Sequence, residues 1–152
     1  MDTTEKRKHW MSVLAQASFE KLSTLWQQSQ TQHGLPPDYM IIRPAEIGLA
    51  QVRARMGSTG RQFNIGDVTI TRAAVQLAGG EMGYSYLQGR NKQHAELAAV
   101  LDGLLQADQY HEVVFAQIIS PLAADKQAER ELRQQEVASS KVDFFTMVRG
   151  ED

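Results

Sequence analysis

Residues 79–96 read GGEMGYSYLQGRNKQHAE, and the architecture can be worked out from this stretch in both directions. Gly79 and Gly80 separate two apolar runs, a pattern typical of antiparallel strands joined by a hairpin turn. Gly89 ends the second strand, and an apolar period of helical spacing begins near Leu97. A strand, a glycine and a helix in direct succession predict a sheet covered by a helix.

Two short amphipathic helices are expected before this stretch. Residues 4–17 place apolar side chains at positions i, i+3, i+4 and i+7, and residues 19–26 carry a second apolar stripe. Neither segment is long enough to be stable alone, so residues 1–34 are predicted to form a helical hairpin that packs on the rest of the domain. From residue 38 to 89 the apolar period changes to two, which predicts an antiparallel sheet.

A helix and a mixed segment are expected after this stretch. Residues 90–107 are predicted to be a central helix, and residues 112–149 a strand, a charged helix and a terminal strand. The β-branched segment 112–119 favours a strand, with a helix as the competing interpretation, and the apolar segment 142–148 is also β-like. The whole chain, residues 1–152, is therefore predicted to be one α+β domain. Its antiparallel sheet is expected to have about four to six strands, with helices largely on one face.

The longest β-like run contains a change of phase that bears on a possible docking surface. Its apolar residues shift from even to odd numbers, which predicts an irregularity just before Arg72. Without that irregularity, Arg72 lies on the apolar side and needs a carboxylate partner. Arg53 and Arg55 then share the opposite face with Thr69 and Thr71. That face is either solvated or a docking surface for an acidic partner.

The start of the central helix is a candidate anion site. A helix start has unpaired backbone N–H groups, and Arg90, Lys92 and His94 add three potential cations beside them. An ordinary solvated helix start is the alternative, and an ordinary position for His94 at the edge of the core is compatible with it.

The composition excludes several classes of function. The apolar fraction of 42% is that of a globular protein, and the formal net charge of −2 does not point to nucleic acid or an anionic membrane. No apolar run approaches the ~18 residues of a membrane span, and the N-terminus lacks the apolar core of a secretory signal, so a cytoplasmic location is expected. The chain has no cysteine, which excludes disulfides, thiol nucleophiles and cysteine-ligated iron–sulfur clusters on it.

The sequence has no pattern typical of catalysis or metal binding. The four histidines are scattered without the spacing of metal ligands, and neither a nucleophile elbow nor a dinucleotide fingerprint is present. Single carboxylates without an evident partner are Asp67, Glu81, Glu96 and Asp102. We therefore expect a binding or assembly subunit with no catalytic residue and no metal site.

The C-terminal apolar segment is a second candidate for partner docking. In a strand, the adjacent Phe144 and Phe145 face opposite sides, so only one of them can enter the core of the domain. The other needs cover from another element or from a neighbouring subunit. In isolation, the chain could meet that need by self-association into a homo-oligomer.

Short motifs spread over nearly the whole chain indicate, when taken together, a resemblance to one protein family. They are HWMSVLA (9–15), RMGSTG (55–60), GD (66–67) with TRAAV (71–75), GYS (83–85) with QGR (88–90), KQHAE (92–96) and VDFFTMVRG (142–150). Together they resemble the PhnG subunit of the bacterial carbon–phosphorus lyase core, which acts in organophosphonate breakdown. The departures are Ser58, where the family has glycine, Tyr86, where tryptophan is common, and Asn91, where aspartate is expected. The change at Asn91 puts in doubt any role for an acid at that helix start.

The resemblance implies an accessory subunit of an enzyme complex. With PhnH, PhnI and PhnL, such proteins displace adenine from ATP with methylphosphonate and form α-D-ribose 1-methylphosphonate 5-triphosphate. A radical-SAM iron–sulfur subunit, PhnJ, later cleaves this product. The resemblance therefore implies ATP as a substrate of the complex, an iron–sulfur cluster and SAM on a partner, no cofactor on this chain, and no activity of the chain alone.

The sequence and the resemblance together leave three roles open for the chain. The first is a purely structural subunit of the transferase complex. The second is a subunit that also offers an anion-binding edge, through Arg90, Lys92 and His94, to the triphosphate of ATP or product. The third is a stand-alone anion- or nucleotide-binding module without catalytic activity.

Overall fold

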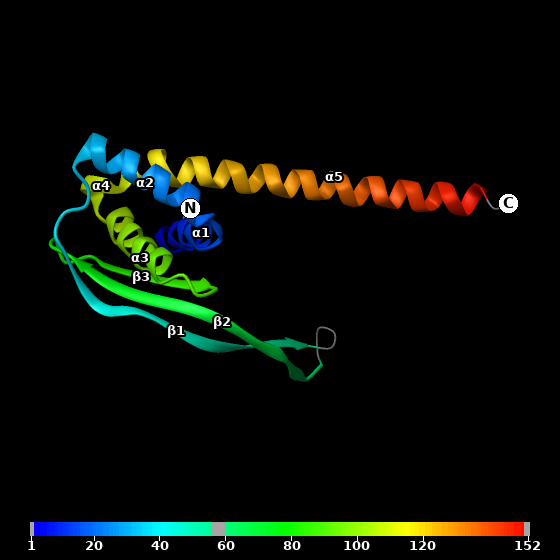
Figure 1. The fold of residues 1–152 in the computed structure, drawn as a ribbon, viewed down its shortest axis with the longest axis horizontal. Helices are drawn as coiled ribbons and strands as arrows, with labels where there is room; N and C mark the ends of the chain where they lie inside the picture. The colour runs from blue at the N-terminus through cyan, green and yellow to red at the C-terminus, as the bar shows by residue number, and fades with distance from the viewer. Residues whose placement is uncertain (1, 56–59, 151–152) are drawn as a thin grey trace.

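The computed structural model describes residues 2–55 and 60–150, with side chains described up to residue 140 (Figure 1). The elements in chain order are α1 (Thr3–Gln16), α2 (Phe19–His33), β1 (Tyr39–Arg55), β2 (Gln62–Leu77), β3 (Met82–Gln88), α3 (Lys92–Gln106), α4 (Asp108–Val114), η1 (Phe115–Ile119) and α5 (Ser120–Gly150). The π-helical segment η1 joins α4 to α5 without a break, so these three elements form one helical run.

The strands form one antiparallel sheet in the order β1-β2-β3, and the helices lie on one face of it (Figure 1). The prediction of a single α+β domain with an antiparallel sheet is confirmed. In the described part of the chain the sheet has three strands, slightly fewer than the four to six expected. The expected strands at 112–119 and 142–148 are wrong, because both segments are helical.

Segment 112–119 is helical because its apolar residues repeat at helical spacing. Val114, Ile118 and Leu122 follow one another at intervals of four, and all three are buried. This stripe packs in the same core cluster as residues of α2 and α3. The β preference of branched side chains is weak, and burial of one continuous stripe outweighs it.

The terminal segment is part of α5, which continues to Gly150. Phe144 and Phe145 therefore belong to a helix and do not face opposite sides of a strand. Their side chains lie outside the described residues, so their proposed role in partner docking stays a prediction.

Strand β2 runs without the predicted irregularity before Arg72. Its register with β3 is continuous from Ile70 to Gln76, so Thr71, Ala73 and Val75 face the helices and are buried. Arg72 points to the open face of the sheet, where its Nε donates to Glu46 Oε1 at 2.8 Å. The pairing of β1 with β2 does have register shifts, and one of them, between Arg43 and Glu46, lies opposite Arg72. The expectation that Arg72 lies on the apolar side is wrong, and its ion pair with Glu46 is exposed to solvent.

Close packing of α3 on β3 depends on Gly83. A Cβ atom at this position would lie 1.9 Å from the carbonyl oxygen of Ala99, so no larger residue fits there without a shift of the backbone. Two residues later, Ser85 donates from Oγ to the carbonyl of Ala95 at 2.6 Å. The glycine and the small hydroxyl side chain let the helix axis approach the strand, and the apolar stripe of α3 then fills the core.

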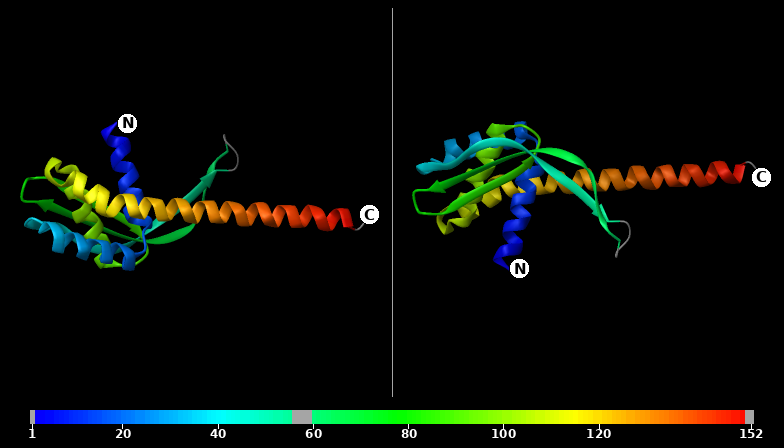
Figure 2. Two further views of the ribbon diagram at one scale, coloured as in Figure 1. Left: turned by 90° about the horizontal axis from the view of Figure 1, so that it is seen from above. Right: turned by 90° about the horizontal axis from the view of Figure 1, so that it is seen from below.

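The two N-terminal helices are present, but they do not form the predicted helical hairpin. Figure 2 shows them running at a steep angle to each other. Helix α1 packs on α3 and β3, whereas α2 packs on η1. Each helix buries its own stripe against a different part of the domain, so neither stabilises the other as a hairpin partner would.

Two elements project from this body in different directions (Figures 1 and 2). One is the outer half of the β1–β2 hairpin. The other is α5, whose 31 residues correspond to a length of about 46 Å. None of the helices in the ranges that the structure describes is both long and apolar enough to cross a bilayer.

Candidate functional site

The predicted anion site at the start of α3 contains one buried histidine and two exposed cationic residues. Asn91 caps the helix, because its side-chain oxygen accepts from the backbone N–H of His94 at 3.0 Å. Arg90 and Lys92 are exposed to solvent. The His94 ring is buried, donates from Nε2 to the carbonyl of Leu14 at 2.8 Å, and lies against Phe19. The imidazole therefore holds α1 and α2 against α3, while the other two side chains face solvent.

A buried carboxylate that the sequence did not reveal joins three elements. Asp102 of α3 is fully buried, and both its oxygens accept hydrogen bonds from the guanidinium of Arg7, at 3.2 and 2.8 Å. Trp10 Nε1 donates to the same carboxylate at 2.8 Å, and the backbone N–H of Tyr84 at 2.9 Å. The hydrogen bond to Asp102 raises the pKa of Arg7, partial burial opposes this, and the negative charge of Asp102 adds to the increase.

This carboxylate also protects the outer edge of the sheet. Tyr84 belongs to the edge strand β3, and its N–H would otherwise be free to pair with another strand. Gln106 Nε2 donates to the neighbouring carbonyl of Met82 at 2.7 Å, so α3 caps this edge at two successive groups. With its lone pairs engaged in hydrogen bonds, Asp102 has the environment of a structural group and not that of a general base.

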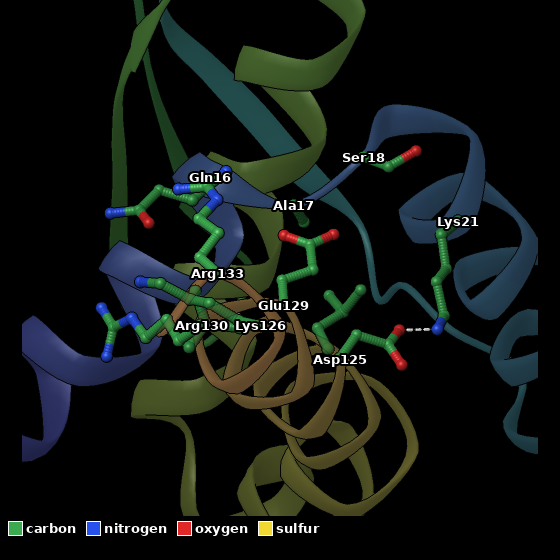
Figure 3. A pocket seen from close by; sticks show the side chains of 11 residues that line it. Gln16, Ala17, Ser18, Lys21, Asp125, Lys126, Glu129, Arg130 and Arg133 are labelled. Atoms are coloured by element: carbon green, nitrogen blue, oxygen red, sulfur yellow. Dashed lines mark ion pairs between the residues drawn. The ribbon is translucent and has the colours of Figure 1, made fainter. Parts of the chain in front are cut away.

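A strongly charged concave surface is a cleft between α1, the α1–α2 junction and the start of α5 (Figure 3). It consists of two neighbouring cavities of about 230 and about 410 Å³, and Lys126 and Arg130 line both. We call this surface the basic cleft and define it by its positively charged side chains, Lys8, Lys21, Lys126, Arg130 and Arg133.

Part of the positive charge in the basic cleft is neutralised, because its five cations face the three carboxylates Glu5, Asp125 and Glu129, and Lys8 pairs with Glu5 at 3.6 Å. Lys21 forms an ion pair with Asp125, and Glu129 is the other carboxylate in the smaller cavity (Figure 3). Lys126 donates to Ser12 Oγ at 3.3 Å, and burial, followed by repulsion from Arg130, lowers the pKa of its ammonium group. Within residues 2–55 and 60–140, neither Lys126 nor Arg130 lies within ion-pair distance of a carboxylate. An anion would relieve this repulsion.

The sequence contains a pattern that indicates the positive charge of this cleft. Lys126, Arg130 and Arg133 are spaced i, i+4 and i+7, so they lie on one side of α5. Only the fold shows that this side meets α1 and Ser12, more than a hundred residues earlier in the chain.

Arg53 and Arg55, predicted to dock a partner, lie near the outer end of the β1–β2 hairpin and are exposed. Leu49 pairs with Thr69 and Ile47 pairs with Thr71, so odd-numbered residues of β1 in this region share the face of the two threonines. Thr71 is fully buried under the helices, so the face of the two threonines is not the solvated face that the sequence suggested, and the docking role of Arg53 and Arg55 stays a prediction. As for metal binding, no group of three His, Asp or Glu side chains converges in the part of the chain that the structure describes.

An α+β body that carries a cationic cleft and two projecting elements has the form of a binding or assembly protein. The chain belongs to the PhnG family, because the family model described as phosphonate metabolism protein PhnG matches residues 5–150. A relative from Rhizobium meliloti (strain 1021), the alpha-D-ribose 1-methylphosphonate 5-triphosphate synthase subunit PhnG, is 39% identical over 147 residues. The match covers 97% of this chain and 91% of the relative. The resemblance seen in the sequence motifs is confirmed.

Proposed function

We propose that this chain is an accessory subunit of an α-D-ribose 1-methylphosphonate 5-triphosphate synthase. The observation that carries the proposal is the 39% identity to such a subunit over 97% of the chain. In this proposal the chain acts with PhnH, PhnI and PhnL when methylphosphonate displaces adenine from ATP. The iron–sulfur cluster and SAM needed for later cleavage of the product are proposed to belong to PhnJ.

An accessory role is also supported by the chemistry of the described side chains. The deepest carboxylate, Asp102, is engaged by Arg7, Trp10 and the backbone of Tyr84. The buried imidazole of His94 is bonded to a backbone carbonyl. Groups held in this way stabilise a fold, and proton transfer would break the contacts that hold it together.

A second role, as a contributor of positive charge to a phosphate-bearing ligand, is favoured by the basic cleft. Lys126 and Arg130 line both of its cavities and repel each other, so a bound anion would be attracted there. In this role the chain would help to hold the triphosphate of ATP or product. Arg90 and Lys92, exposed at the start of α3, are a separate candidate for the same task.

The test of the proposed function is reconstitution of the synthase. The four subunits are co-expressed and purified with and without this chain, and release of adenine from ATP is measured in the presence of methylphosphonate. We expect release from the complete set, little from the set that lacks this chain, and none from this chain alone. Equal rates with and without the chain would contradict the proposal.

The anion role is tested in the same assay. Lys126→Ala with Arg130→Ala should raise the ATP concentration needed for half-maximal rate, while Lys6→Ala, an exposed cation of α1 outside the cleft, should not. Co-purification of the variant subunit with its partners shows that assembly is intact. An unchanged dependence on ATP in an assembled complex would rule out the role of the cleft.

A further inference from the structure

The outer half of the β1–β2 hairpin carries apolar side chains that nothing in the described chain covers. We call this part the arm and define it as residues 47–55 and 60–70. Its exposed large apolar residues are Ile47, Leu49, Phe63 and Ile65. Leu49 is 70% exposed and Ile65 is 64% exposed, values that are usual for charged side chains and not for leucine and isoleucine.

The arm is also poor in internal support. It extends past the helices that cover the rest of the sheet (Figure 1). A two-stranded hairpin without such cover is only marginally stable in water, and grouped apolar residues on a protein surface mark interaction sites. Binding of another molecule would remove the apolar side chains of the arm from water, so we expect the arm to be an interaction site.

The charge of the arm indicates the chemistry of what it binds. Arg53, Arg55 and Arg61 lie at its outer end, and Asp67 is its only carboxylate among the described residues. No ion pair of the three arginines with a carboxylate is found in the ranges that the structure describes. Arginine beside apolar side chains is the typical composition of a protein–protein interface. The complementary surface is apolar with carboxylates at one end.

A second copy of this chain does not fit the arm well. Strand β1 is at the edge of the sheet, but its register is broken on both sides of Arg43, and Pro44 has no N–H to donate. These features interrupt edge-to-edge pairing of two copies at the base of the hairpin, outside the arm. Packing two arms face to face would bring Arg53 and Arg55 of one copy close to those of the other, which is unfavourable because like charges repel.

We infer that the arm is the docking surface by which this chain binds a different subunit of the synthase, through an apolar patch with carboxylates at one end. The inference rests on the proposed function, because it takes the partner from the same complex. Ile47 and Leu49 pair with Thr71 and Thr69 and therefore lie on one face of the arm, and the contact uses that face. The opposite face, with Arg72 and Tyr86, remains outside it.

The experiment compares variants of the two faces in pull-downs from the co-expressed complex. Ile47→Asp with Leu49→Asp places charge on this face of the arm, and Tyr86→Asp places it at a residue that is 57% exposed on the other face. We expect the first variant to bind the partner subunits at least about tenfold more weakly and the second to bind normally. Circular dichroism and thermal unfolding check that both are folded.

Charge reversal tests the predicted carboxylates. Arg53→Glu with Arg55→Glu should weaken binding and reverse its dependence on salt, because repulsion replaces attraction. Lys6→Glu, an equally exposed cation on α1, serves as the control and should leave binding unchanged.

Each outcome decides something. If the unaltered chain does not co-purify with the other subunits, the proposed function fails, and the inference fails with it. If the unaltered chain binds and the Ile47 and Leu49 variant binds equally well, only the inference fails. If Tyr86→Asp is as damaging as the arm variant, the assignment to one face is wrong. Sedimentation that shows a dimer broken by the arm variant, with partner binding intact, would identify a second copy as the occupant.

Discussion

Helix α3 and the arm are both apolar segments, but the apolar side chains of α3 are buried whereas those of the arm are exposed to solvent. Ten residues of α3 are buried, and they pack on β2 and β3 at a distance set by Gly83. The arm leaves Leu49, Ile65 and their neighbours in solvent. The apolar surface of α3 stabilises this fold, whereas the apolar surface of the arm is free to stabilise an assembly. Substitutions in the two regions should therefore affect different measurements.

The largest effect on stability is expected for Asp102→Ala. Its removal leaves the guanidinium of Arg7, Trp10 Nε1 and the N–H of Tyr84 without an acceptor. Leaving a buried donor such as Trp10 Nε1 without an acceptor costs about 1–3 kcal/mol, and the charge of Arg7, whose side chain is 34% exposed, adds less than a fully buried charge would, so the free energy of unfolding in urea should fall by about 3–5 kcal/mol. Asp38→Ala, at an exposed carboxylate with no side-chain hydrogen bond among those described, is the matched control. A loss below about 1 kcal/mol would show that water or a rearranged side chain satisfies these donors.

The next prediction compares two leucines directly. Leu101 of α3 is fully buried, and its replacement by alanine should cost about 2–5 kcal/mol because a cavity remains. Leu49→Ala in the arm should change stability by less than about 0.5 kcal/mol, since the side chain is already in water. Denaturant unfolding of the isolated chain measures both. Equal losses would mean that the arm is covered in solution and that the contrast between the regions is wrong.

A smaller effect is expected at the start of α3. If Arg90 and Lys92 help to hold a triphosphate, replacing both by alanine weakens nucleotide binding by the assembled complex. Each exposed charge contributes only up to about 1 kcal/mol, so for the two together the change in affinity should stay within about thirtyfold. Isothermal titration with ATP measures it. Unchanged affinity in a correctly assembled complex would leave both residues as solvated charges of the helix start.

The smallest predicted effect is a dependence of stability on pH from Lys126. Its pKa is lower in the folded chain than in the unfolded chain, so the folded state binds fewer protons in the pH range between the two values. Stability should therefore rise slightly with pH across that alkaline range. Lys126→Gln should flatten the rise, and Lys6→Gln should leave it unchanged. A fall in stability over the same range that disappears in Lys126→Gln would mean that the sign of the pKa shift is wrong.

The sequence alone was sufficient where the signal is local. The glycine pair before β3, the period of two from β1 to β3 and the apolar stripe of α3 each span a few turns or residues, and they predict an α+β domain correctly. The motifs of the PhnG family are local too, and the family match over residues 5–150 agrees with them. The prediction of a strand at the β-branched segment of η1 is wrong because a strand preference and a helical spacing coexist there.

Only the tertiary structure could reveal contacts between distant residues. Asp102 looked like a single carboxylate because its partner Arg7 is 95 residues away. The side chains of Lys126 and Ser12 meet across 114 residues to form part of the basic cleft. Periodicity records which side of an element is apolar, but it does not record which element that side will meet. The burial of α3 and the exposure of the arm depend on which element packs against each apolar side, and only the packing of the whole chain determines that.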